Sequence, residues 1–286
     1  MLATGATEIR RLSESDIPAA MRLKEAAGWN QTEADWRRLL ALEPHGCFGA
    51  FKEERLVGTT TTTTYGNELA WIGMVLVDPQ QRRQGIATQL LDVALGYLKE
   101  RVATVKLDAT PEGQPLYERF GFEFESVLQR WSRPRPSRGN PTDRQKVMDR
   151  SEVSKLLQLD QLAFGADRSP LIEDLIAASV VAPGLLKKAD GTLSGYALAR
   201  PGSAADYIGP VVTNDPRQIG KLLDGALAQL QGTQVYVDCN TDCFANAQEL
   251  SERGFVKERD LIRMTLGAPA QKTSPLIFAI AGPEVG

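Results

Sequence analysis

The sequence is poor in the residues that form metal and disulfide sites, with three cysteines and one histidine among 286 residues. Cys239 and Cys243 are too few for a zinc site without further soft ligands. A nucleophile pair of Cys47 and His45 is disfavoured, because residues two apart in a loop rarely have the required geometry. We therefore expect no metal site and reduced cysteines.

Long apolar runs and a strong charge excess are also missing. No run approaches the roughly 20 apolar residues that span a bilayer, and the opening segment MLATGATEIRRLSESD lacks the apolar core of a signal peptide. With 24% charged residues and a formal charge of −3, the composition indicates neither a nucleic-acid nor a membrane partner. We expect a cytoplasmic protein whose length predicts about two domains.

The most informative segment that is present runs from Trp71 to Leu91. Trp71 to Val77 is apolar at almost every position, which is typical of a central strand covered on both faces, and Asp78 and Pro79 end it. The helix that follows is amphipathic. Its buried face is formed by residues four apart: Ile86, Leu90, Ala94 and Leu98.

The turn between this strand and helix has the chemistry of an anion site. A helix N-terminus is partly positive, yet here Arg82 and Arg83 precede it and no acid lies near. Gly85 lets the backbone approach an anion closely, Ala87 leaves the first turn unobstructed, and Thr88 adds a hydroxyl donor. A pyrophosphate fits these groups. The alternative is an ordinary strand-to-helix turn with two solvated arginines.

The order Arg82, two residues, Gly85, one residue, Ala87 resembles the acetyl-coenzyme A (acetyl-CoA) signature of the GNAT N-acetyltransferase superfamily. The resemblance implies an α/β fold, in which each domain is a mixed, largely antiparallel sheet flanked by helices. It also implies acetyl-CoA as cosubstrate. The expected cofactor-binding residues are Val75, Leu76, Val77, Arg82, Arg83, Gln84, Gly85, Ile86, Ala87 and Thr88.

The chain contains an internal repeat. The same short sequences recur in the same order, in the first half at Ile72–Gly73, Asp78–Pro79 and Leu90–Asp92, and in the second at Ile208–Gly209, Asp215–Pro216 and Leu222–Asp224. Two copies of one α/β unit explain this order. We predict two tandem GNAT-like domains, residues 1–134 and 147–286, joined by a proline- and arginine-rich linker at 135–146.

The second copy lacks the pieces that carry the chemistry. Residues 80–89 separate Pro79 from Leu90, but residues 217–221 alone separate Pro216 from Leu222, so the phosphate turn is missing. We therefore expect a degenerate second domain, with the nucleotide of coenzyme A bound in the first domain alone. The apolar end of the chain, Leu276 to Ala281, predicts a last strand.

Tyr117, in the segment PLYERFGF, is the candidate general acid. GNAT enzymes commonly carry a tyrosine at this place, where its phenol protonates the coenzyme A thiolate. Ordinary pKa values of about 10 for a phenol and about 8.5 for a thiol keep Tyr117 protonated near neutral pH. The alternative is a core aromatic beside Phe120 and Phe122. The second copy has Leu250 at the corresponding position, so it lacks this acid.

The general base is less well defined. An alkylamine with a pKa of about 10.4 must lose a proton before it attacks, which calls for a carboxylate or a water chain leading to one. Glu68 and Asp108 are candidates on location, and each is also explained as a solvated or hydrogen-bonded acid. Stabilisation of the oxyanion is expected from a main-chain N–H between Val75 and Val77.

We therefore predict an acetyl-CoA-dependent N-acetyltransferase that acts on a primary amine by direct attack. A binding module that senses acetyl-CoA without turnover is the alternative. The acceptor is left open as a small-molecule or peptide amine, and formation of a homodimer is left open as well. The second domain either walls the acceptor site or only buries apolar surface.

Overall fold

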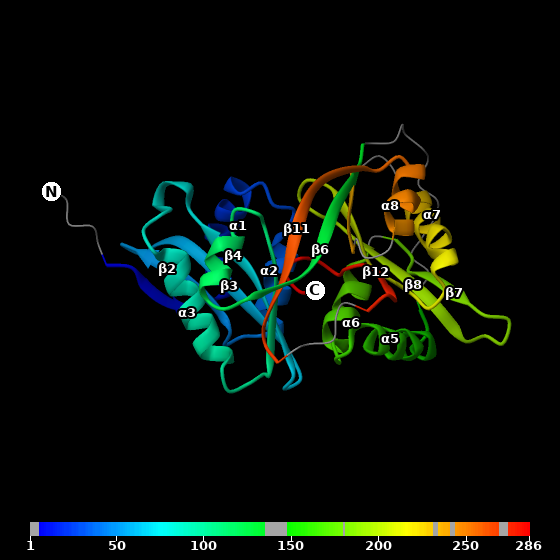
Figure 1. The fold of residues 1–286 in the computed structure, drawn as a ribbon, viewed down its shortest axis with the longest axis horizontal. Coiled ribbons are helices and arrows are strands. Elements are labelled where there is room, and N and C mark those ends of the chain that lie inside the picture. Colours follow the sequence, from blue (N-terminus) through cyan, green and yellow to red (C-terminus); the bar gives the residue numbers. More distant parts are fainter. Residues whose placement is uncertain (1–5, 135–147, 180, 231–233, 241–243, 269–273) are drawn as a thin grey trace.

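The computed structural model describes residues 6–134, 148–179, 181–230, 234–240, 244–268 and 274–286 (Figure 1). The predicted linker at 135–146 and Cys243 lie outside the described residues. No helix of the part that is described is long and apolar enough to cross a membrane.

The elements of the two halves follow one another in a similar order. Those of the first half are β1 (Glu8–Arg11), η1 (Glu14–Asp16), α1 (Ile17–Ala26), α2 (Glu33–Leu42), β2 (Cys47–Lys52), β3 (Arg55–Tyr65), β4 (Leu69–Val77), η2 (Pro79–Gln81), α3 (Ile86–Leu98), β5 (Thr104–Ala109), α4 (Gln114–Arg119) and β6 (Glu123–Arg133). Those of the second half are α5 (Arg150–Phe164), α6 (Ser169–Ala178), β7 (Gly184–Lys187), β8 (Leu193–Arg200), β9 (Asp206–Thr213), η3 (Pro216–Gln218), α7 (Ile219–Gln229), β10 (Val235–Asn240), α8 (Phe244–Glu252), β11 (Val256–Gly267) and β12 (Ile277–Ala279).

All described strands belong to one sheet, in the order β1-β2-β3-β4-β5-β11-β6-β10-β12-β9-β8-β7. The pairs β4–β5 and β9–β10 are parallel, and the remaining pairs among the described strands are antiparallel. The predicted mixed, largely antiparallel α/β fold with flanking helices is therefore confirmed.

The halves exchange strands at the centre of this sheet. β11 of the second half lies between β5 and β6 of the first, with Ile262 opposite Ala109 on one side and Val127 on the other. β6 in turn pairs with β10 of the second half, from Val235 opposite Arg133 to Asn240 opposite Leu128. Figure 1 shows β6 and β11 running together through the middle of the molecule. The sheet of each half is therefore completed by a strand of the other.

Helices cover both faces of the sheet, and successive residues of a strand pack against helices on opposite faces. Trp71 of β4 and Leu198 of β8 join one core shared by both halves, which contains α1, α2, α5 and α6. Their neighbours Ile72 and Ala199 face the other side, where α3 and α4 cover the first half and α7 and α8 the second. The α1, α2, α5 and α6 side is thus a single core that joins the two halves.

The order of the elements shows the predicted repeat. It also shows the predicted loss of the turn before the helix in the second half. In the first half, residues 82–85 separate η2 from α3, whose buried positions Ile86, Leu90, Ala94 and Leu98 are at most 2% exposed. In the second half, α7 begins at Ile219 directly after η3. The turn with anion-site chemistry is therefore present in the first half alone.

The two halves also differ beside their central strands. β9 and β10 pair at Asp206 with Val235 and at Tyr207 with Tyr236. Beyond that point β12 lies between them, with Ala279 opposite both Cys239 and Val211. The predicted last strand is confirmed, and it fills this gap in the second half. In the first half, no described strand enters the matching gap between β4 and β5.

Candidate active site

The loop before α3 leaves the N-terminus of this helix open. Gly85 precedes the helix with a left-handed backbone (φ +79°), and no side chain caps the first turn, which contains no acid. By contrast, Thr32 caps α2 and Asp149 caps α5 with side-chain oxygens. Arg82 and Arg83 are exposed in the loop. The free N–H groups and the two guanidinium groups therefore form a positive site that faces solvent.

The remaining expected anion-site residues lie in the same place. Gln84 is exposed, Ile86 is buried beneath the loop, and Ala87 and Thr88 of the first helical turn are half-buried. A Cβ added to Gly85 would meet no atom within 4 Å, so the space above the loop is open. The local sequence thus places a compact set of donors around an open surface, which is what a diphosphate requires.

Lys52, at the end of β2, is a neighbour of this loop that the sequence did not indicate. Its Nζ donates to Gln84 Oε1 at 2.6 Å and to Gln81 Oε1 at 3.0 Å. Lys52 therefore fixes the loop and brings a third cation to it. A lysine ahead of an ordinary hairpin turn carries no sequence signal for this role, because its position depends on the pairing of β2 with β3.

The gap beside β4 leads away from this loop. β4 and β5 pair from Leu69 with Thr104 to Trp71 with Lys106. β4 then continues to Val77 without β5, paired with β3 on its other edge. Val75 and Val77 are half-buried along the gap, whereas Leu76 is buried in the shared core. The three expected residues of the central strand therefore line the gap or lie directly behind it.

One main-chain donor is directed into the gap by the strand geometry. The N–H of Asp78 donates to the Val57 carbonyl of β3 at 2.8 Å. Because successive N–H groups of a strand point to opposite edges, the N–H of Val77 faces the gap. This donor is suited to stabilise an oxyanion.

A bulge in β4 lies at the middle of the gap. Thr59 of β3 pairs with Leu76, but Thr61 pairs with Gly73, so β4 contains an additional residue here. Met74 has φ +50°, and its carbonyl accepts a hydrogen bond from Thr59 Oγ1 at 2.7 Å. A bulge bends a strand and redirects its groups, which separates β4 from β5 at this point.

Tyr117 lies on the α3 and α4 side of the sheet. It is 8% exposed and packs edge-on against Phe122, with ring centroids 6.0 Å apart. Its hydroxyl makes no hydrogen bond within the described residues, and burial raises the pKa of the phenol above its ordinary value. The phenol therefore stays protonated well above neutral pH.

The two candidate bases are placed very differently. Glu68 is exposed in the turn between β3 and β4, at the end of β4 opposite the Arg82 loop, so the structure does not bring it to the gap. Asp108 lies on β5 beyond the residues that pair with β4. Arg263 of β11 donates to both of its oxygens at 2.8 and 2.9 Å. Burial raises the pKa of Asp108 despite this guanidinium.

The end of the chain covers the opposite face of β4. We call residues 282–286 the tail. Trp71 Nε1 donates to the Pro283 carbonyl at 3.0 Å, and the Tyr65 hydroxyl donates to the Val285 carbonyl at 2.7 Å. A Cβ added to Gly73 would lie 2.6 Å from the Glu284 carbonyl oxygen. The tail is therefore in direct contact with the central strand beside the bulge.

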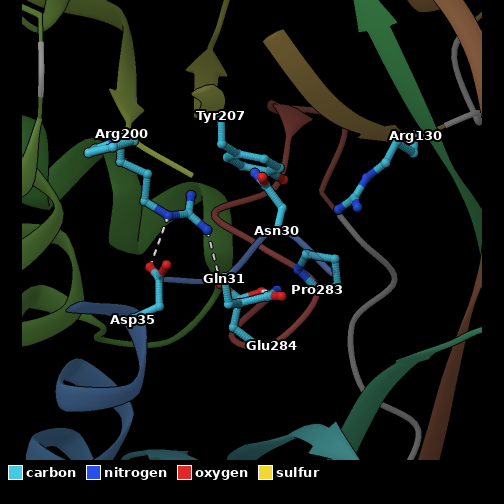
Figure 2. Close-up of a pocket in the computed structure, with 9 residues that line it drawn as sticks. Asn30, Gln31, Asp35, Arg130, Arg200, Tyr207, Pro283 and Glu284 are labelled. Carbon is cyan, nitrogen blue, oxygen red and sulfur yellow. Dashed lines mark hydrogen bonds and ion pairs between the residues drawn. The ribbon is translucent and has the colours of Figure 1, made fainter. Parts of the chain in front are cut away.

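A small polar cavity lies between the halves next to the tail (Figure 2). Its free volume is about 10 Å³, the size of one water molecule. The lining residues come from both halves and from the tail: Asn30, Gln31, Asp35, Arg130, Arg200, Pro201, Tyr207, Pro283 and Glu284. None of them was indicated by the sequence, since they meet only in the folded chain.

Charges around this cavity are paired across the halves. Arg200 of β8 donates to Asp35 of α2 at 3.3 Å and to Glu284 at 2.9 Å, and Arg38 also binds Asp35. Burial opposes ionisation of Asp35, but Arg200 and Arg38 outweigh it and hold the pKa of this carboxyl below its ordinary value. These ion pairs join α2, β8 and the tail.

The Cys47 thiol and the His45 imidazole do not form a catalytic pair. Cys47 is fully buried, its thiol donates to the Leu39 carbonyl at 3.7 Å, and burial raises the pKa of the thiol to about 12. His45 is exposed. In the described part of the chain, no group of three or more His, Cys, Asp or Glu residues is arranged to hold a metal ion.

Two family models match the chain, one in each half. The model described as "Acetyltransferase (GNAT) family" matches residues 11–122, and the one described as "Acetyltransferase (GNAT) domain" matches residues 156–279. Each match spans the central strand of its half and the helix after it.

Relatives resemble the chain over most of its length. It is 26% identical over 255 residues to the uncharacterized N-acetyltransferase YitH of Bacillus subtilis (strain 168), with 88% of each chain covered. It is 25% identical to a holothin acyltransferase of Pseudoalteromonas sp. (strain SANK 73390), covering 91% of this chain and 88% of that protein. A crystal structure of a putative acetyltransferase from Pyrococcus horikoshii has the same fold, with a TM-score of 0.81, 23% identity, and coverage of 100% and 98%.

Both halves thus match GNAT models, and relatives of the whole chain are named as acyl-transferring enzymes. The predicted superfamily and tandem organisation are confirmed. The chain is an acetyltransferase of the GNAT superfamily with two GNAT domains in tandem.

Proposed function

We propose that the first half transfers the acetyl group of acetyl-CoA to a primary amine by direct attack. The observation that carries this proposal is the gap between β4 and β5. At one end lies the open, positively charged N-terminus of α3, and Tyr117 lies on the α3 and α4 face. The opposite face of β4 is covered by the tail at Gly73, and an amine would reach the gap from that side, next to the tail. The protein is proposed to act in the cytoplasm, on the basis of its sequence.

In this proposal the loop and the first turn of α3 hold the diphosphate of acetyl-CoA. Arg82 and Arg83 neutralise its charge, and main-chain N–H groups from Gly85 onward donate to its oxygens. The remaining arm follows Val75 and Val77 along the gap. The thioester carbonyl then lies within reach of the Val77 N–H, which would stabilise negative charge on its oxygen.

The transfer itself needs few groups. The amine nitrogen attacks the thioester carbon, a C–N bond forms and the C–S bond breaks. The departing thiolate takes the phenol proton of Tyr117, and the amine loses one proton to Asp108 or to water in contact with it. Of the two candidate bases, Asp108 lies at the gap and Glu68 does not. Holding both reactants together supplies much of the acceleration.

Replacing Tyr117 by phenylalanine tests this proposal. Acetyl transfer, measured as release of free thiol, should fall by about 10²- to 10⁴-fold, while the Kd for acetyl-CoA stays nearly unchanged. Tyr97→Phe is the matched control. It removes a phenol that lies away from the gap and donates a hydrogen bond to Glu43 at 2.6 Å. Equal turnover in Tyr117→Phe and the unaltered chain would reject Tyr117 as the acid. If the unaltered chain binds acetyl-CoA without any turnover, the alternative of a binding module that senses acetyl-CoA is favoured.

The pH profile gives a second readout of the same residue. Burial raises the pKa of Tyr117, so this group stays protonated as the pH rises toward 10. The rate should therefore increase with pH as the amine loses its proton, with no descending limb from the tyrosine below about pH 10. A descending limb near pH 8 that disappears in Tyr117→Phe would contradict this environment.

A further inference from the structure

The tail is a fixed part of the core on the acceptor side of β4. Its Val285 is 3% exposed, and the residues just before it, Ile280 and Ala281, are 1% and 0% exposed. The Gly286 carbonyl accepts a hydrogen bond from Arg168 of the second half at 2.7 Å. The tail is thus held both by hydrogen bonds to its main chain and by apolar burial. It forms a wall of the proposed acceptor site.

The flanks of this wall are closed by contacts between the halves. The α1, α2, α5 and α6 helices share one core. Arg38 of α2 binds Asp174 of α6, and Lys24 of α1 donates to Ser203 Oγ at 2.8 Å. An extended polypeptide laid along the acceptor face of β4 would have to displace the tail and separate these helices. The tail therefore leaves no room for a polypeptide on this face, and an acceptor must be small enough to reach the gap next to the tail.

The cavity beside the tail offers an unused acceptor to such a ligand. Gln31 is 7% exposed, and its Nε2 donates to Glu284 Oε2 at 2.8 Å, whereas its Oε1 has no hydrogen-bond partner. Figure 2 shows Gln31 beside Glu284, with Arg130 across the cavity. A buried oxygen without a partner is suited to an N–H donor. An amino group is about the size of the water molecule that this cavity can hold.

We propose that the acceptor is a small-molecule amine, and that an amino group of it enters this cavity and donates a hydrogen bond to Gln31 Oε1. The proposal rests on the proposed function and narrows its acceptor class, since a polypeptide amine is excluded by the tail. Glu284 is a positioning residue. Its carboxylate, held by Arg200 at 2.9 Å, accepts the Gln31 amide hydrogen at 2.8 Å, which fixes the amide and leaves Oε1 without a partner.

The test compares small and polypeptide acceptors on the full-length chain with acetyl-CoA. The panel pairs free lysine with a lysine-containing decapeptide, and adds diamines, amino sugars and a folded lysine-rich protein, with thiol release and product mass as readouts. The best small amine should exceed the peptides and the protein by about 100-fold or more in kcat/KM. Peptide or protein turnover equal to that of the small amines would overturn this inference and leave the proposed function intact. If acetyl-CoA binds and no panel member is acetylated, the proposed function itself fails.

Gln31→Met tests the cavity with the best small amine of that panel. The KM for the amine should rise about 10-fold, because the acceptor oxygen is lost, while the Kd for acetyl-CoA stays unchanged. Gln248→Met is the matched control, as it breaks a similar amide–carboxylate bond, 2.8 Å long, on the surface of α8. An unchanged KM in Gln31→Met would overturn the assignment of this cavity. The comparison of acceptor classes uses the unaltered chain, so it holds even if this variant folds poorly.

Discussion

Gly85 is the residue on which the proposed phosphate-binding loop depends most. Its φ of +79° is one that residues with a side chain rarely adopt, although a Cβ there would meet no atom within 4 Å. Gly96 on α3 has equally open surroundings and no left-handed backbone. The two glycines therefore differ in backbone conformation but not in the room available for a Cβ, so substitutions at the two positions form a matched pair.

Gly85→Ala should raise the Kd for acetyl-CoA about 10-fold, because the left-handed backbone costs a residue with a Cβ roughly 1–2 kcal/mol. Gly96→Ala should leave this Kd unchanged and stabilise the protein by about 0.5–1 kcal/mol, since alanine favours a helix interior. Calorimetric titration and thermal unfolding of both variants provide the two measurements. Equal affinities in Gly85→Ala and Gly96→Ala would argue that the loop does not bind the cosubstrate.

At the scale of residues, the sequence predicted those whose role depends on near neighbours in the chain. Arg82 to Thr88 is one turn, so its composition alone indicates an anion site. Gln31, Arg200 and Glu284 are far apart in the sequence, and each is an ordinary polar residue in its own segment. They line one cavity when the halves meet, through contacts such as Arg200 with Glu284 at 2.9 Å. No local pattern could have indicated them.

Among the elements, β4 was predictable from its continuous apolar run, and α3 was predictable from apolar residues four apart. The bulge of β4 was not, since Met74 adopts φ +50° to satisfy the pairing with β3. The last strand was predicted from its apolar run, but its partners were not. β12 fills the gap between β9 and β10, and this position depends on strands far away in the sequence. No described strand fills the same gap in the first half, where we propose that the cosubstrate binds.

Asp35 connects elements of both halves, so its ionisation should control stability in acid. Its folded pKa lies below the ordinary value of 3.8. Its contribution is therefore fully present above that pH and is lost as the pH falls through the folded pKa. Removing one partner of a buried ion pair costs about 3–5 kcal/mol. Asp35→Asn should lose about this much at pH 7, with the difference from the unaltered chain shrinking below pH 4.

Urea unfolding of both proteins between pH 2 and 7 measures this dependence. Glu33→Gln is the control, because Glu33 lies in the same helical turn and forms an exposed pair with Arg37. It should change stability by less than about 1 kcal/mol at every pH. A constant difference between Asp35→Asn and the unaltered chain down to pH 2 would show that the carboxylate is not the group that titrates.

At the scale of the whole molecule, the repeat predicted two copies of one unit but could not show that they exchange strands. Hydrophobic periodicity marks β6 and β11 as strands without specifying their partners. In the fold, β11 completes the first half and β6 pairs with the second. The halves are therefore parts of one sheet, and each depends on the other to cover a strand edge.

Residues 1–134 expressed alone should consequently fail to form the native domain. Without β11, β5 and β6 lose their shared neighbour, and the apolar face of α1 and α2 loses its cover. The fragment should be aggregated or show little cooperative unfolding, and addition of residues 147–286 should restore some activity. Circular dichroism, size-exclusion chromatography and thiol release measure this. A monomeric fragment with full activity would show that the first half needs no strand from the second.

The central claim is that acetyl-CoA occupies the gap of the first half, and that β12 fills the matching gap of the second. A crystal structure of the full-length chain with acetyl-CoA tests it most directly. We expect one cosubstrate per chain, with its diphosphate on the N–H groups of residues 85–88 and its thioester beside Val77. A cosubstrate seated between β9 and β10, or bound away from both gaps, would contradict this account.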